Sequence, residues 1–205
     1  DKGHFTKNNY NEMANYFDWS DVLLIGPGLG QNESTKELVK KIVTNYTKPL
    51  IIDADALSCF TGNLELFNKI KNEYIVTPHH GELARLFDKS NSNIIDNLIE
   101  YLQEYMNEFK GTLVAKNAPT LIAQGNEVSV NSTGNQGLAT GGTGDVLSGV
   151  IASFAAQGIP ASIAAELGVF IHGKAADFVA EQKGYRGMIA SDLLDMLPQT
   201  IMTYE

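Results

Sequence analysis

The segment Asn131-Ser-Thr-Gly-Asn-Gln-Gly-Leu-Ala-Thr-Gly-Gly-Thr-Gly-Asp145 is a glycine-rich loop that leads directly into the apolar run Val146-Leu-Ser-Gly-Val-Ile-Ala-Ser-Phe154. We expect the run to form a helix whose first turn offers free backbone N–H groups and the positive end of the helix dipole to an anion. Glycines allow the backbone of the loop to approach a phosphate closely. Asp145 then stands where it can accept a proton from an attacking hydroxyl group. The segment therefore predicts phosphoryl transfer to an alcohol.

Two common glycine motifs do not fit this segment. Gly137 and Gly142 have the spacing of a Walker A motif, but Thr143 stands where that motif requires Lys. The G-x-G-x-x-G pattern also fails, because Gly142 and Gly144 are followed by Leu147. The alternative to an anion site is a surface loop in which Asp145 caps the helix.

Outward from this loop, the chain alternates short apolar runs with helical patterns. Leu38, Val39, Ile42, Val43 and Tyr46 have helical spacing. This alternation predicts an α/β fold with a mostly parallel sheet, in which polar segments after the strands meet at one edge. The expected strands, each followed by its polar segment, are Val22-Leu-Leu-Ile25 before Gly26-Pro-Gly-Leu-Gly30, Leu50-Ile-Ile52 before Asp53-Ala-Asp55, Tyr74-Ile-Val-Thr77 before Pro78-His-His-Gly-Glu82, and Thr112-Leu-Val-Ala115 before Lys116.

Further elements follow from the same patterns. A hairpin is expected between residues 120–122 and 128–130, and helices over residues 146–156, 161–181 and 191–202. Pro198 predicts a kink or an early stop in the last helix. A helix is also expected through residues 94–109, with core packing rather than cofactor binding by the stripe of Leu98, Leu102, Tyr105, Met106 and Phe109.

Composition limits the functional classes. The chain has 205 residues and a formal net charge of −9, with no basic stripe, so we expect one domain over residues 1–205 that does not bind nucleic acid. Its one cysteine, Cys59, excludes an internal disulfide and a cysteine-based metal site. Glu166 and His172 interrupt the most apolar stretch, and the first residues are polar. We therefore expect a cytoplasmic protein without a membrane span.

Five segments together carry a family resemblance. They are Gly26-Pro-Gly-Leu-Gly30, Asp53-Ala-Asp-Ala-Leu57, Thr77-Pro-His-His-Gly-Glu82, Lys116-Asn-Ala-Pro-Thr120 and Gly134-Asn-Gln-Gly-Leu-Ala-Thr-Gly-Gly-Thr-Gly-Asp145. In this order they resemble the NAD(P)H-hydrate dehydratase family, which consists of carbohydrate-kinase-related repair enzymes of the ribokinase-like superfamily. The resemblance implies a three-layer ribokinase-like domain and covers the chain from Asp21 onward.

The family repairs nicotinamide cofactors damaged by hydration. The resemblance implies that the 6-hydroxyl of the S epimer of hydrated NADH or NADPH is phosphorylated by a nucleotide. Phosphate then leaves and the ring double bond returns. The Gly-Gly-Thr-Gly-Asp form is similar to that of the ADP-using branch, so ADP (or ATP) is the expected co-substrate, together with Mg²⁺.

The resemblance also assigns roles to residues. Asp145 would be the catalytic base. Gly30, His79, Glu82 and Asp145 would bind the hydrated cofactor, and no residue is assigned to the metal. The nucleotide would be held by two loops, formed by Lys116, Asn117, Ala118, Pro119 and Thr120 and by Asn135, Gly137, Thr140, Gly141, Gly142, Thr143 and Gly144.

Several of these residues have a second interpretation from the sequence alone. Asp53 and Asp55 either position Mg²⁺ or phosphate, or form a polar turn after a strand. His79 contacts the nicotinamide part or is an ordinary loop histidine, and Lys116 meets a phosphate or is a solvated cation. His172 lies in an apolar helix and is expected to be structural.

The sequence departs from the family in three ways. Asn117 stands where the family usually has Gly, and we expect it to tolerate a left-handed turn. His80 replaces a usual Pro. The family domain begins earlier, so the chain is expected to be truncated at its start relative to the family and to leave a sheet edge unpaired.

Three questions of function and assembly stay open at this level. The same cradle and Asp145 would serve a small-molecule kinase of the same superfamily. A non-catalytic nucleotide-binding fragment is the third alternative. The helix over residues 161–181 is apolar around its circumference, so it is either buried in the domain or forms a homo-oligomer contact.

Overall fold

The computed structural model describes residues 3–108 and 110–205, and within them the strands form one six-stranded sheet in the order β1-β2-β3-β4-β5-β6. The first four strands pair in parallel, whereas the β4–β5 and β5–β6 pairs are antiparallel. Their bounds are β1 (Leu23–Ile25), β2 (Leu50–Ile52), β3 (Tyr74–Val76), β4 (Thr112–Ala115), β5 (Leu121–Gln124) and β6 (Glu127–Val130). The predicted α/β fold, its mostly parallel sheet and the β5–β6 hairpin are therefore confirmed.

Helices cover both faces of this sheet. The α-helices are α1 (Tyr10–Ala14), α2 (Glu33–Asn45), α3 (His80–Leu86), α4 (Asn91–Asp96), α5 (Leu98–Met106), α6 (Thr143–Ala156), α7 (Ala161–Lys183) and α8 (Ala190–Met202). Short 3₁₀ helices complete the chain: η1 (Lys7–Asn9), η2 (Ala54–Cys59), η3 (Leu64–Lys69) and η4 (Gln136–Ala139).

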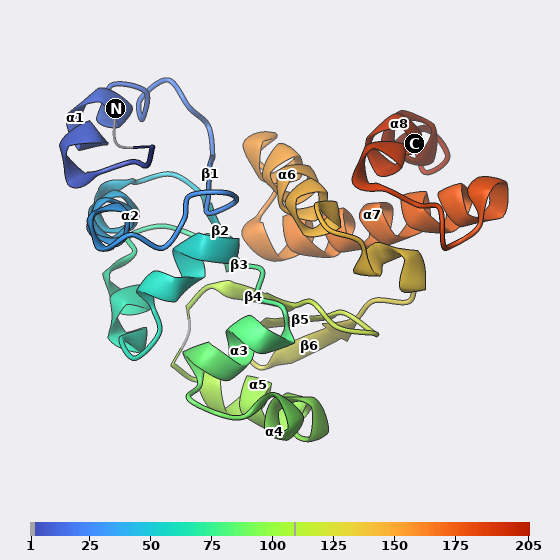
Figure 1. Ribbon diagram of the computed structural model, residues 1–205, viewed down its shortest axis with the longest axis horizontal. Helices are drawn as coiled ribbons and strands as arrows, with labels where there is room; N and C mark the ends of the chain where they lie inside the picture. Colours follow the sequence, from blue (N-terminus) through green and yellow to red (C-terminus); the bar gives the residue numbers. More distant parts are fainter. Residues whose placement is uncertain (1–2, 109) are drawn as a thin grey trace.

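The alternation of side chains along each strand creates two cores. Ile51, Ile75 and Val114 point to the face that packs against α6 and the first half of α7. Their chain neighbours, such as Ile52 and Val76, point to the opposite face and pack with α2, η2, η3 and α3–α5. Figure 1 shows this three-layer arrangement, with α6 and α7 on one side of the sheet and α2 to α5 on the other.

The helix expected over residues 94–109 is two helices in the structure. The amide of Asn97 donates to the carbonyl of Asn93 at 3.1 Å, and Asn97 itself leaves helical geometry between α4 and α5. Ile95 and Ile99, which belong to the apolar pattern that predicted this helix, are exposed. Core packing is confirmed for its members Leu98, Leu102 and Met106. The other two members of the core stripe, Phe109 and the side chain of Tyr105, lie outside the described residues.

Of the two outcomes expected at Pro198, the early stop was wrong and the kink stays a prediction. Helix α8 continues through Pro198 to Met202. Leu193 and Met196 on this helix pack against Val179 of α7, and Thr200 donates to the carbonyl of Met196 at 2.9 Å. Tertiary packing therefore outweighs the backbone hydrogen bond that proline cannot make.

Helix α7 lies inside the domain for most of its length. It packs against α6, α8 and the strands β3 to β5, and residues such as Ala164, Ala165 and Ala175 have no exposed surface. The apolar circumference of this helix is thus explained largely by burial within one chain. In the part of the chain that the structure describes, no helix combines the length and apolar character needed to cross a bilayer.

Candidate functional site

The glycine-rich loop leads into the N-terminus of α6, which is accessible to an anion. Gly142 adopts a left-handed φ of 89° at the N-cap of α6, a conformation that favours glycine, and no side chain caps the helix. The helix begins at Thr143, so Asp145 lies in its first turn. Asp145 is exposed, and its carboxylate has no hydrogen bond or ion pair within the described residues. The predicted combination of a free helix end and a free carboxylate is present.

Helix α7 fixes the loop that precedes α6. Asp177 accepts hydrogen bonds from the backbone of Gly134 at 3.2 Å and from the amide of Asn135 at 3.1 Å. Asn135 in turn accepts from the backbone of Gly137 at 3.0 Å. A methyl group on Gly173 would lie 2.3 Å from Oγ1 of Thr133, so the loop rests directly on the helix backbone. The loop expected to hold the nucleotide is therefore preformed.

The hydroxyl groups of Thr140 and Thr143 are already bonded to backbone carbonyl groups. Thr143 donates to the carbonyl of Leu138 at 2.7 Å or of Thr140 at 2.8 Å. Thr140 donates to the carbonyl of Gly137 at 3.0 Å or of Met188 at 3.2 Å. Gly141 and Gly142 are exposed between them. The loop can therefore offer backbone N–H groups to a ligand more readily than these hydroxyl groups.

Lys116 stands beside this helix start in a buried network. Its Nζ lies 2.8 Å from Oδ1 of Asp53, and a methyl group on Gly144 would lie 3.4 Å from the same Nζ. Ser148 donates to Oδ2 of Asp53 at 2.5 Å, or to the carbonyl of Gly144 at 3.1 Å. Asp53 is 1% exposed and Ser148 is fully buried. The network joins the ends of β2 and β4 to the first turns of α6 and holds an ammonium group next to the anion cradle.

The two aspartates after β2 have structural partners. Both oxygens of Asp53 are used by Lys116 and Ser148. Oδ2 of Asp55 accepts the backbone N–H of Gly30 at 2.8 Å, which holds the Gly26–Gly30 loop against η2. Neither aspartate belongs to a group of three potential metal ligands within the described residues. Both aspartates therefore hold neighbouring segments of the site in place.

His79 and Glu82 cap α3. The Nδ1 atom of His79 accepts the backbone N–H groups of Gly81 at 3.0 Å and Glu82 at 3.3 Å, while Glu82 accepts the backbone N–H of His79 at 2.8 Å. Nε2 of His79 lies 3.4 Å from Oε1 of Glu82. Burial lowers the pKa of His79 although the Glu82 carboxylate opposes this shift. His79 is therefore a neutral capping residue whose half-exposed ring face remains available to a ligand.

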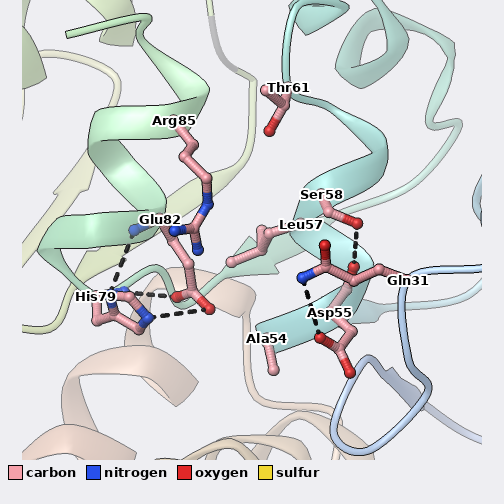
Figure 2. A pocket seen from close by; sticks show the side chains of 9 residues that line it. All are labelled: Gln31, Ala54, Asp55, Leu57, Ser58, Thr61, His79, Glu82 and Arg85. Atoms are coloured by element: carbon pink, nitrogen blue, oxygen red, sulfur yellow. Dashed lines mark hydrogen bonds and ion pairs between the residues drawn. The ribbon is translucent and has the colours of Figure 1, made fainter.

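These capping residues form one wall of a polar pocket of about 210 Å³. Figure 2 shows His79, Glu82 and Arg85 extending from α3 on one side, and Asp55, Ser58 and Gln31 on the other. Gly30 adjoins the pocket through its bond to Asp55. An isolated parallel bridge between His79 and Lys116 connects this wall to the anion cradle. The residues expected to bind substrate thus gather next to those expected to bind nucleotide.

The segment Lys116-Asn-Ala-Pro-Thr120 forms a compact turn at the end of β4. Ala118 and Pro119 are joined by a cis peptide bond, and Thr120 donates to the carbonyl of Asn117 at 3.1 Å. Asn117, Ala118 and Pro119 are exposed. Asn117 is not among the described residues with a positive φ, so the turn forms without the left-handed conformation that Asn117 was expected to tolerate.

His172 supports the first turn of α6 from beneath. It is 6% exposed, and its Nε2 donates to the carbonyl of Thr143 at 2.9 Å. Burial lowers the pKa of this histidine to about 4. A neutral imidazole in this position agrees with the structural role expected from the sequence.

Sequence reasoning identified neither Ser148 nor Asp177 as a site residue, and Arg85 entered only as the end of the range 80–85, which the resemblance places on the substrate side. Ser148 interrupts the apolar run 146–154, and Asp177 interrupts the apolar stretch 161–179. A polar residue within an apolar helix pattern was therefore the signal for two of them. Arg85 carried no such signal, because an arginine in a polar segment is usually solvated.

Comparison with known proteins gives consistent matches. A family model described as NAD(P)H-hydrate dehydratase matches residues 4–199. The bifunctional NAD(P)H-hydrate repair enzyme Nnr of Moorella thermoacetica is 41% identical over 186 residues, which are 90% of this chain and 35% of that protein. The chain thus spans about a third of the length of this curated relative.

Solved structures agree with the sequence matches. The ADP/ATP-dependent NAD(P)H-hydrate dehydratase from Bacillus subtilis, co-crystallised with ATP and Mg²⁺, superposes with a TM-score of 0.82 at 31% identity, covering 90% of this chain and 65% of that one. A ribokinase-like superfamily protein from Enterococcus faecalis superposes with a TM-score of 0.79 at 29% identity, covering 97% and 68%. The expected ribokinase-like fold is confirmed by these two superpositions.

Proposed function

This chain belongs to the NAD(P)H-hydrate dehydratase family, and on that premise we propose that it uses ADP to dehydrate the S epimer of hydrated NADH or NADPH. The observation that carries the proposal is the uncapped start of α6 with exposed Asp145 in its first turn and the Lys116 ammonium beside Gly144. This arrangement supplies anion stabilisation and a proton acceptor within one helical turn.

The proposed reaction has two stages. In the first, Asp145 accepts the proton of the 6-hydroxyl as that oxygen attacks the terminal phosphorus of ADP, and AMP leaves as the bond between the bridging oxygen and that phosphorus breaks. The N–H groups of the α6 start and Lys116 stabilise the negative charge of the transferring group. In the second, the electron pair of the ring nitrogen expels inorganic phosphate from C6, and loss of a proton from the neighbouring C5 restores the double bond of the reduced nicotinamide. Bound Mg²⁺ would neutralise charge on the nucleotide phosphates.

Residue roles in this proposal follow the geometry. The loop 134–144 and the turn 116–120 hold the nucleotide, while Gly30, His79 and Glu82 border the hydrated cofactor. Because the polar atoms of His79 and Glu82 are engaged in capping α3, we propose that His79 contacts the substrate through its ring face.

Product analysis tests the proposed function. The chain is incubated with ADP, Mg²⁺ and hydrated NADPH, and both inorganic phosphate and the absorbance of the reduced nicotinamide are followed. The proposal requires the two products to appear together. A stable phosphorylated alcohol would instead identify a small-molecule kinase. Thermal stabilisation by ADP without any turnover would identify a non-catalytic nucleotide-binding chain.

We also propose that the chain forms a homo-oligomer and acts in the cytoplasm, where reduced nicotinamide cofactors and ADP are available. The support for association is the exposed pair Ile163 and Leu167, which lie one turn apart on α7 and are 45% and 38% exposed.

A further inference from the structure

The polar pocket between α3 and η2 contains an arginine for which the described residues provide no counter-ion. Arg85 lines this pocket, and its guanidinium forms no ion pair within the described residues. Figure 2 shows the side chain extending from α3 into the pocket, across from Asp55. A guanidinium offers several N–H donors in a planar fork that matches a phosphate or carboxylate.

The opposite wall offers acceptors rather than donors. Oδ2 of Asp55 is held by the backbone N–H of Gly30 at 2.8 Å, whereas the one contact of Oδ1 among the described residues is with the amide of Gln31 at 3.5 Å. Oδ1 therefore keeps the capacity to accept a hydrogen bond from a hydroxyl group. A ligand that complements both walls carries an anionic group at one end and hydroxyl groups at the other.

The size and position of the pocket further limit which ligands can bind there. Its volume of about 210 Å³ is below the roughly 300–1,000 Å³ of pockets that enclose a drug-sized ligand, so it holds one part of a larger molecule. His79, which lines the pocket, is bridged to Lys116 beside the anion cradle. The rest of the ligand can therefore reach the start of α6.

We propose that this pocket binds a ribose–phosphate unit of the dinucleotide, with Arg85 on the phosphate and Asp55 on a ribose hydroxyl group. The inference rests on the proposed function and deepens it. Asp55 and Glu82 place negative charge around the pocket, which repels a phosphate unless a cation compensates it. Arg85 is the lining residue that carries a permanent positive charge.

The test measures binding rather than turnover. Calorimetric titrations of NADPH and NADH, the stable repaired cofactors, are compared for the wild-type chain and Arg85→Met. We expect the affinity of at least one cofactor to fall about 10- to 100-fold, the usual contribution of hydrogen bonds to a charged group. Arg85→Lys should recover part of the loss. An equal loss for both cofactors assigns Arg85 to the shared diphosphate, and a loss for NADPH alone assigns it to the 2′-phosphate.

Lys89→Met is the matched control. It removes the same charge four residues away, where Lys89 lies over the Tyr101 ring and outside the pocket; it should bind both cofactors as the wild type does. Unchanged cofactor affinity in Arg85→Met, an equal loss in Lys89→Met, or no cofactor binding by the wild type would overturn the inference. Cofactor binding that depends on Arg85, without dehydratase turnover, would refute the proposed function and leave this inference standing.

Discussion

Asp145 is the residue on which the proposed chemistry depends. Its carboxylate is exposed in the first turn of α6 and has no partner within the described residues. We expect Asp145→Asn to lower turnover by about 100-fold or more, the usual contribution of a general base, while ADP affinity changes little. Asp195→Asn, which changes an exposed carboxylate on α8, is the control and should retain full activity. Undiminished turnover in Asp145→Asn would remove this residue from the mechanism.

His172 predicts a defined pH dependence of stability. Its pKa falls from an ordinary 6.5 to about 4 in the folded chain because of burial. Between these two values the unfolded chain binds more protons, so the free energy of unfolding decreases as the pH falls from 6.5 toward 4. Through His172, the free energy of unfolding is about 3 kcal/mol higher above pH 6.5 than below pH 4.

Urea denaturation at neutral pH and near pH 4.5 measures this effect. His172→Gln can still donate to the carbonyl of Thr143 but does not titrate. We therefore expect the variant to lose less stability than the wild type on acidification. Equal losses in the two proteins would show that other groups cause the acid sensitivity.

The crossing of α6 and α7 is the element contact that supports the cradle. A methyl group on Gly168 of α7 would lie 2.5 Å from Cγ1 of Ile151 on α6, so the two helices touch through glycine. Gly168→Ala should lower the free energy of unfolding by about 1–3 kcal/mol through overpacking.

Gly149 on α6 provides the matched control for this substitution. It is exposed, and a methyl group there meets no atom within 4 Å. Gly149→Ala should raise the free energy of unfolding by about 0.5–1 kcal/mol through helix propensity. Thermal denaturation of both variants measures whether stability falls in Gly168→Ala and rises in Gly149→Ala. A neutral effect of Gly168→Ala would mean that the helices separate easily.

Elements with a strong apolar period could be predicted from the sequence, and short polar elements could not. Strands β2 and β4 have the expected bounds because each is a continuous apolar run that ends at a charged residue. Helix α3 was not expected, since His79 as its cap is an unusual choice. The break at Asn97 likewise depends on one side-chain bond inside a continuous apolar pattern.

The candidate site likewise has a part that could be predicted from the sequence and a part that could not. The cradle and Asp145 lie in one local motif, and their relation follows from the helix start that the motif predicts. Ser148 and Asp53, however, are 95 residues apart in the sequence and meet only through the packing of α6 on the sheet. The partners of Asp53 could therefore be identified only from the structure. The same holds for the position of Arg85, Asp55 and Gln31 around one pocket.

For the whole molecule, the association state is the property that surface exposure predicts. Ile163 and Leu167 expose apolar surface on α7, and Trp19 is 82% exposed beside the edge strand β1. We expect light scattering at micromolar concentration to give a multiple of the 22.3 kDa chain mass. Ile163→Lys should lower this mass if the α7 pair forms the contact. A monomer mass for the wild-type chain would contradict the proposed homo-oligomer.

The uncapped start of α6 also sets how fast individual amide protons exchange with deuterium. The described backbone bonds give the N–H groups of Gly144 and Asp145 no acceptor, whereas that of Val146 is bonded to Gly142. Exchange at the first two positions should be fast in the free chain, while the remainder of the helix is protected. A bound phosphate would take up these two protons and slow their exchange, so the occupancy of the cradle becomes visible at two backbone positions without any turnover.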